Sequence, residues 1–112
     1  MPGPAVLVVE DDPSVQTTLC ATFTMLGFMP HRTESVEGAL RILGRKHIDA
    51  VMLDIRLPDP TGLQRSGLSL LAFLRATPDY ANVPVLIFTG MPLSSDDDAL
   101  AHKHNAEVSY KP

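Results

Sequence analysis

The chain has 112 residues and a formal net charge of −4, a length that favours a single domain. Its 45% hydrophobic and 20% charged residues indicate a packed core rather than a disordered segment. The acidic balance argues against direct nucleic-acid binding, which needs a basic surface. One cysteine, Cys20, excludes an internal disulfide and a cysteine-based zinc site. Because no run reaches membrane-spanning length and the N-terminus does not resemble a signal peptide, we predict a cytoplasmic domain without membrane contact.

Three continuous apolar runs predict strands that are buried on both faces, as in a parallel sheet. These runs are Ala5–Val9, Ala50–Leu53 and 85–88. Two further strands are predicted at 28–33 and at Glu107–Tyr110.

Helical patterns fill the intervals between the strands. Asp12 followed by Pro13 is typical of a helix start, and Gly27 of a helix end. Between them, we expect one inward face made of Val15, Leu19, Phe23 and Leu26. A second helix is expected to be capped by Ser35, to end at Gly44, and to turn three residues inward. Those three are Val36, Leu40 and Leu43.

Two more helices are predicted in the second half of the chain. Leucines at helical spacing mark the third: Leu68, Leu71 and Leu74. The fourth runs from about 95 to 104 and carries three aspartates in its first turn, where the helix dipole favours negative charge. The alternating order predicts a doubly wound α/β sheet. Such a sheet needs helices on both faces, and four leave one face partly uncovered, so we expect the chain to be cut from a longer one.

Chemically active side chains follow the predicted strands at the edge where ligands bind in open α/β sheets. Glu10 and Asp11 end the first strand, Asp54 the third, Thr89 the fourth and Lys111 the last. Each has an ordinary structural explanation, such as a turn aspartate or a solvated lysine. Together, three clustered carboxylates repel one another and require a cation, and Mg²⁺ is the usual one beside carboxylates and a phosphate.

Four motifs, VLVVEDDP, VMLDIRLP, IFTG and YKP, resemble those of the receiver domain of bacterial two-component response regulators. The likeness covers essentially the whole chain, which implies one receiver domain over residues 1–112 with its C-terminal helix apparently truncated. It implies a flavodoxin-like, doubly wound five-stranded parallel sheet with strand order 2-1-3-4-5.

Carried onto this sequence, the resemblance makes Asp54 the phosphoacceptor and also a metal ligand. Asp11 is implied as a direct Mg²⁺ ligand, Glu10 as a ligand through water, and Arg56 as a ligand through its backbone carbonyl. Thr89 is implied as the switch hydroxyl.

Lys111 is implied to pair with a phosphoryl oxygen, and its bond to Pro112 is often cis in this family. The implied phosphodonor is a sensor histidine kinase or a phosphotransfer protein, and the response is a changed surface at helix four and strand five. The domain would then catalyse only its own phosphorylation and dephosphorylation.

Three features depart from the family pattern. The usual aromatic residue three positions before the lysine is Val108 here, whereas Tyr110 shares its strand parity and lies roughly 6–7 Å away along the strand. Gly62 and Gly67 each begin a Gly-Leu pair, which suggests a five-residue insertion after Asp54. The missing last helix often contributes to dimer contacts in this family, so the sequence leaves open whether the domain forms a homodimer.

Met91, two residues after Thr89, offers no base to a water molecule, and we therefore predict slow self-dephosphorylation.

Three rival functions are weighed against the phosphorylation switch. A haloacid-dehalogenase-type enzyme needs a second acid two residues after the nucleophile, and that position is Arg56. A flavin-binding protein needs a phosphate-cradling first loop, but that loop is acidic. A binding or dimerisation module that keeps the fold but signals without phosphate is the stronger alternative, because Val108 departs from the switch pattern.

Overall fold

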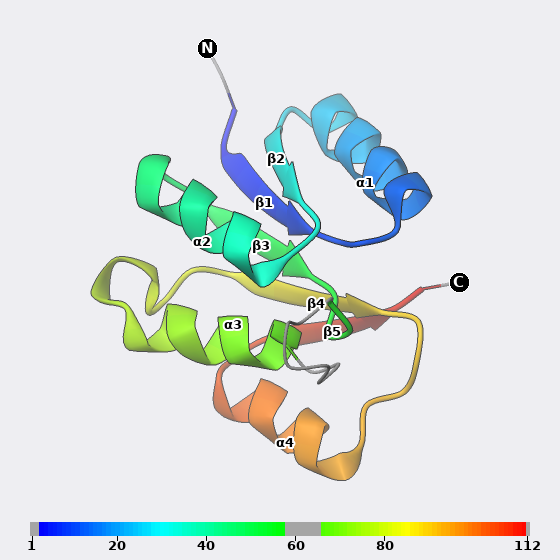
Figure 1. Ribbon diagram of the computed structural model, residues 1–112, viewed down its shortest axis with the longest axis vertical. Helices are drawn as coiled ribbons and strands as arrows, with labels where there is room; N and C mark the ends of the chain where they lie inside the picture. The colour runs from blue at the N-terminus through cyan, green and yellow to red at the C-terminus, as the bar shows by residue number, and fades with distance from the viewer. Residues whose placement is uncertain (1–2, 58–65, 112) are drawn as a thin grey trace.

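The computed structural model describes residues 3–57 and 66–111 and shows one five-stranded parallel sheet (Figure 1). The strand order is β2-β1-β3-β4-β5, which confirms the predicted fold class and topology. The strands are β1 (Ala5–Val9), β2 (Met29–Thr33), β3 (Ala50–Leu53), β4 (Val85–Thr89) and β5 (Glu107–Tyr110).

Among the described residues, four α-helices and one short 3₁₀ helix connect these strands. They are α1 (Pro13–Met25), α2 (Val36–Arg45), α3 (Ser66–Ala76), η1 (Pro78–Tyr80) and α4 (Ser95–Lys103). The helices α2, α3 and α4 lie in a row along one face of the sheet, and α1 packs against β1 and β2 on the other (Figure 1). No helix of the described segments is long and apolar enough to span a membrane.

The helix α1 starts and stops as predicted, but one of its apolar residues does not point inward. The Asp12 carboxylate accepts hydrogen bonds from the backbone of Ser14 and Val15, and Gly27 takes the positive φ of 91° that ends a helix. Val15, Leu19 and Phe23 are half-buried. Leu26 is 67% exposed, because it is the C-cap residue beyond the end of the helix, where helical spacing no longer determines which way a side chain points.

The helix α2 corrects two expectations. Ser35 caps it, as predicted, by accepting a hydrogen bond from the Gly38 backbone. The helix continues through Gly44 to Arg45, since a single glycine weakens a helix without ending it. Leu40 is exposed rather than inward, and Ala39 occupies the buried position.

The core lies between the sheet and the row of three helices. Three fully buried leucines of α3 fill its centre: Leu70, Leu71 and Leu74. The strands β1 and β3 are buried on both faces, apart from a half-buried Ala50, as their apolar runs predict. The strand β4 is different, because Leu86 and Phe88 on the α1 side are half-buried while Val85, Ile87 and Thr89 are buried. The prediction that both faces of the strand are buried was therefore wrong for β4.

Candidate functional site

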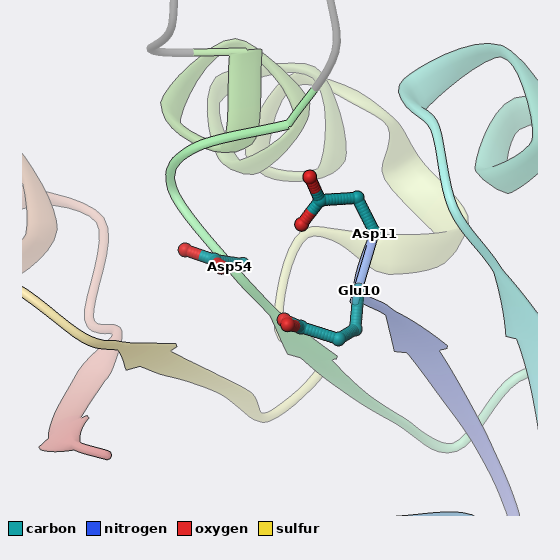
Figure 2. A group of neighbouring side chains, drawn as sticks. All are labelled: Glu10, Asp11 and Asp54. Carbon is teal, nitrogen blue, oxygen red and sulfur yellow. The ribbon is translucent and has the colours of Figure 1, made fainter. Parts of the chain in front are cut away.

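The sheet register gathers the predicted acids at one edge. Parallel pairing places Val9 of β1 beside Leu53 of β3, so the residues that follow both strands emerge side by side. The Asp54 backbone N–H donates to the Val9 carbonyl, which extends this pairing by one residue. Figure 2 shows Glu10, Asp11 and Asp54 projecting from these two strand ends into a common space. One carboxylate oxygen from each residue lies within 4.8 Å of the corresponding oxygens of the other two. The predicted clustering of the three acids is confirmed.

Two of the acids are buried and share one ammonium group. Glu10 is 2% exposed and Asp54 is 6% exposed. The Nζ of Lys111 lies 2.8 Å from Glu10 Oε1 and 2.9 Å from Asp54 Oδ2. The second oxygen of Asp54 accepts a hydrogen bond of 3.1 Å from the Arg56 backbone N–H. These contacts leave Asp54 in a defined orientation at the end of its strand.

The electrostatics of the cluster appear in two pKa shifts. Burial raises the pKa of the Glu10 carboxyl, and the hydrogen bond from Lys111 offsets this only in part. Burial alone would lower the pKa of the Lys111 ammonium, but its hydrogen bonds to Glu10 and Asp54 outweigh that effect and raise it. The lysine is therefore held as a cation by the acids.

The donor set fits a hard divalent cation. Three carboxylates carry a formal charge of −3 and the one ammonium contributes +1, so the cluster keeps an excess of negative charge. Asp11 is exposed, and no described residue hydrogen-bonds to its carboxylate. Oxygen donors of this kind, with solvent access on one side, suit Mg²⁺, which retains several of its water ligands in proteins.

Thr89 and Lys111 lie next to the acids because β4 and β5 continue the same edge. Thr89 is 2% exposed, and its carbonyl accepts a hydrogen bond of 2.9 Å from the Lys111 backbone N–H. Beside Thr89 is a hollow of about 280 Å³ between the loops that follow β3 and β4. Its lining includes Arg56 and Met91. The structure thus brings all the predicted side chains to one place.

The strand β5 carries the departure at Val108 and Tyr110. In the register with β4, Val108 lies beside Ile87 and Tyr110 lies beside Thr89. Val108 is half-buried against the core, whereas Tyr110 is 52% exposed. Tyr110, the aromatic residue of this strand, is therefore the direct neighbour of Thr89 in the sheet.

Gly67 has a structural requirement for glycine. A Cβ at Gly67 would lie 2.2 Å from the Asp54 carbonyl oxygen and 2.6 Å from the Ile55 Cα, so only glycine allows α3 to approach this backbone. Gly62 lies outside the described residues, as do most of the suggested insertion and the bond from Lys111 to Pro112.

Two contacts of Lys111 have no signal in the sequence. Its Nζ lies 5.9 Å from the centre of the Phe88 ring, within range of a cation–π interaction. Its pairing with Glu10 joins residues 101 positions apart. Only the register of β1, β3, β4 and β5 reveals that these groups meet.

The sequence profile of the response regulator receiver domain matches residues 6–108. The chain belongs to this family. It is 32% identical over 85 residues to the TorCAD operon transcriptional regulatory protein TorR of Escherichia coli K12, covering 76% of this chain and 34% of TorR. It is 31% identical over 91 residues to the probable transcriptional regulator ycf29 of Cyanophora paradoxa, covering 81% of this chain and 41% of that protein. The receiver domain thus spans well under half the length of these relatives.

Solved receiver domains have the same fold. The receiver domain of the sensor histidine kinase PA1611 from Pseudomonas aeruginosa, crystallised with magnesium coordinated in its active site cleft, has a TM-score of 0.79 and 29% identity. That match covers 98% of this chain and 86% of the other. The N-terminal domain of a response regulator receiver protein from Methanoculleus marisnigri has a TM-score of 0.80 and 26% identity, covering 96% and 84%. The resemblance first seen in four motifs is confirmed.

Proposed function

We propose that this receiver domain is switched by phosphorylation of Asp54. The observation that carries the proposal is the position of Asp54, a buried carboxylate at a strand end between the Lys111 ammonium and two further acids. A carboxylate that served only to end a strand would not need two acids and a cation around it.

In the proposed reaction, an Asp54 carboxylate oxygen attacks phosphorus and forms an O–P bond as the bond to the donor breaks. With a phosphohistidine donor, the broken bond is P–N, and the imidazole nitrogen leaves with the electron pair and takes a proton from water. Negative charge spreads over the equatorial oxygens in the transition state, so positioning and electrostatic stabilisation provide the catalysis. Lys111, already 2.9 Å from Asp54, supplies one positive charge to those oxygens.

Glu10, Asp11, Asp54 and the backbone carbonyl of Arg56 are the proposed Mg²⁺ site. When bound, the ion neutralises charge on the phosphoryl oxygens and on the acids themselves. The carboxylate cluster supports this assignment, as does the magnesium in the cleft of the PA1611 receiver domain.

The proposed output of the switch passes through Thr89 to α4 and β5. Phosphorylation adds about −1.5 to −2 charges beside the Thr89 hydroxyl. That hydroxyl can then move to the phosphoryl group, and the hollow beside it leaves room for the loop before α4 to follow. Tyr110, the neighbour of Thr89 in the register, is proposed to report this movement on the exposed surface.

The proposed phosphodonor is a sensor histidine kinase or a phosphotransfer protein, and the domain catalyses no reaction beyond its own phosphorylation and dephosphorylation. A cytoplasmic location belongs to the same proposal, and its support is that TorR is named as a transcriptional regulatory protein and ycf29 as a probable transcriptional regulator. A homodimer, formed through the surface of α4 and β5 that phosphorylation changes, is proposed as one output of the switch.

The test is the intact mass of the protein after incubation with a small phosphodonor and Mg²⁺. We expect a gain of one phosphoryl group, dependent on Mg²⁺ and lost in Asp54→Asn. A folded protein that gains nothing would contradict the proposal. It would favour the alternative, a binding or dimerisation module that works without phosphate, for which Val108 in place of an aromatic residue is the supporting observation.

The proposed role of Tyr110 has its own test. Tyr110→Ala should reduce the phosphorylation-dependent amide shifts of α4 while leaving the rate of phosphorylation unchanged. Unaltered shifts in α4 would show that Tyr110 does not replace the aromatic residue missing at position 108.

The lifetime of the phosphorylated form follows from Met91. This side chain is 47% exposed beside the hollow and carries no group that could orient or deprotonate a water molecule. We therefore propose slow self-dephosphorylation. Loss of the added mass within seconds, once the donor is removed, would count against it.

A further inference from the structure

The Gln16 side chain reaches from α1 to the carboxyl ends of two strands. Its Nε2 donates to the carbonyl oxygens of Glu10 and Thr33, each at 3.0 Å. The two N–H groups of a carboxamide can serve two acceptors at once, so both bonds fix the orientation of the group. Gln16 is half-buried, whereas the next two residues of the helix, Thr17 and Thr18, are exposed.

These bonds matter because side-chain contacts do not hold Asp11. Its carboxylate has no hydrogen bond from any described residue, so the backbone around it determines its place in the cluster. That backbone is anchored before and after Asp11. The Glu10 N–H donates to the Thr33 carbonyl at 3.0 Å, and Asp12 caps α1.

The Glu10 carbonyl lies between those two anchors and belongs to the same planar peptide unit as the Asp11 nitrogen. Its direction, together with the φ angle of Asp11, therefore sets the direction in which the Asp11 side chain leaves the backbone. The carbonyl oxygens of Glu10 and Thr33 both lie within hydrogen-bonding reach of one nitrogen. Without a donor between them, their negative ends would repel, and the peptide unit would lose one of the contacts that hold its orientation.

We propose that Gln16 is a positioning residue for the metal site, which fixes Asp11 relative to Glu10 and Asp54 without contacting the ion. The inference rests on the proposed function, because it needs the acids to bind Mg²⁺. A group that orients a metal ligand typically changes affinity 10- to 100-fold when removed. Since Gln16 acts on the backbone of the ligand rather than on its carboxylate, we expect the lower end of that range.

The alternative is that Gln16 only ties α1 to the sheet and so contributes to stability alone. The two roles separate if Mg²⁺ affinity and stability are measured on the same variants. Gln16→Met removes both donors at nearly constant length. Thr18→Val is the matched control, because Thr18 also donates a side-chain hydrogen bond of 3.0 Å to a backbone carbonyl, that of Ser14, within α1.

Titration of amide chemical shifts with MgCl₂ gives the dissociation constant and shows that each variant is folded. We expect Gln16→Met to raise the dissociation constant by about tenfold, and Thr18→Val to leave it unchanged. Gln16→Asn, whose shorter carboxamide cannot span both carbonyls, should act in the same direction and serves if the Met variant unfolds.

The outcomes distinguish the positioning role of Gln16 from the existence of the Mg²⁺ site. If the wild-type protein binds Mg²⁺ and both Gln16 variants bind it equally well, the positioning role is wrong and the proposed metal site stands. If the wild-type protein shows no Mg²⁺-dependent shifts at Glu10, Asp11 or Asp54, the proposed metal site is wrong, and the inference fails with it.

Discussion

The two edges of the sheet satisfy their polar groups in opposite ways. At the carboxyl edge, three carboxylates cluster, and two of them share one ammonium. At the amino edge, side chains mainly face backbone carbonyls and N–H groups. The first arrangement leaves an excess of charge, and the second leaves almost none.

Arg75 and Tyr80 dominate the amino edge. The Arg75 guanidinium donates to the carbonyls of Val83 at 2.7 Å, Tyr80 at 3.3 Å and Ala81 at 3.4 Å, and to His104 at the end of α4. The Tyr80 hydroxyl lies 3.2 Å from two carbonyls at the end of α2, those of Leu43 and Lys46. Together these two side chains connect α2, α3, α4 and η1.

The difference separates stability from function within one small sheet. Hydrogen bonds to backbone carbonyls stabilise the fold without bringing like charges together. Buried like charges destabilise it until a cation arrives. The amino edge therefore supports the fold, and the carboxyl edge is available for binding.

The largest effect is expected at the amino edge, for Arg75→Met. It removes the guanidinium donor from four carbonyls, and we expect a loss of about 3 kcal/mol in the free energy of unfolding. Urea denaturation measures it. Arg41→Met, an exposed arginine of α2, is the control and should change stability by less than about 0.5 kcal/mol. Equal losses of stability in Arg75→Met and Arg41→Met would show that the hydrogen bonds of Arg75 at the amino edge do not stabilise the fold.

A smaller effect, dependent on Mg²⁺, is expected for Lys111→Met. Without the ammonium, Glu10 and Asp54 face each other uncompensated, and we expect a loss of about 2 kcal/mol in metal-free buffer, less than for a fully buried pair because the lysine is partly exposed. Saturating Mg²⁺ should recover part of it. Lys103→Met, at the exposed end of α4, is the control. A loss that Mg²⁺ does not alter would show that Lys111 and the ion do not offset the same charge.

The smallest effect is expected from Asp49 at the amino edge. The hydrogen bond of 2.7 Å from the Ala5 N–H lowers the pKa of the Asp49 carboxyl, and His47 at 2.9 Å lowers it further. Because the folded-state pKa lies below the unfolded value, this contribution is present at neutral pH and is lost as the pH falls through the folded pKa.

The stability difference between the wild-type protein and Asp49→Asn should therefore shrink between pH 7 and pH 3, measured by urea denaturation. Asp79→Asn in η1 is the control for the effect of an Asp-to-Asn substitution at a residue without a side-chain hydrogen bond to the described part of the chain. A difference for Asp49→Asn that is the same at both values would contradict a role for the ionised carboxylate.

Much of this architecture could be predicted from the sequence, because the decisive signals are local. Apolar runs, caps such as Asp12 and Ser35, and the stop at Gly27 depend on neighbouring residues, and the acids of the site directly follow the runs. Long-range contacts could not be predicted. The pairing of Lys111 with Glu10 and the bond from Gln16 to Thr33 depend on the register between strands. The exposure of Leu26 and Leu40 depends on where α1 ends and on how α2 packs against the sheet, which spacing alone does not show.

The most direct test of the contrast between the two edges is the free energy of unfolding, measured as a function of Mg²⁺ concentration at constant ionic strength. The wild-type protein should gain about 1.4 kcal/mol at a Mg²⁺ concentration tenfold above its dissociation constant. Asp11→Asn, which removes an exposed acid from the cluster, should be more stable than the wild type without Mg²⁺ and should gain little from it. A wild-type stability that is independent of Mg²⁺, or an equal gain in Asp11→Asn, would contradict the view that the carboxyl edge holds its acids together for a cation.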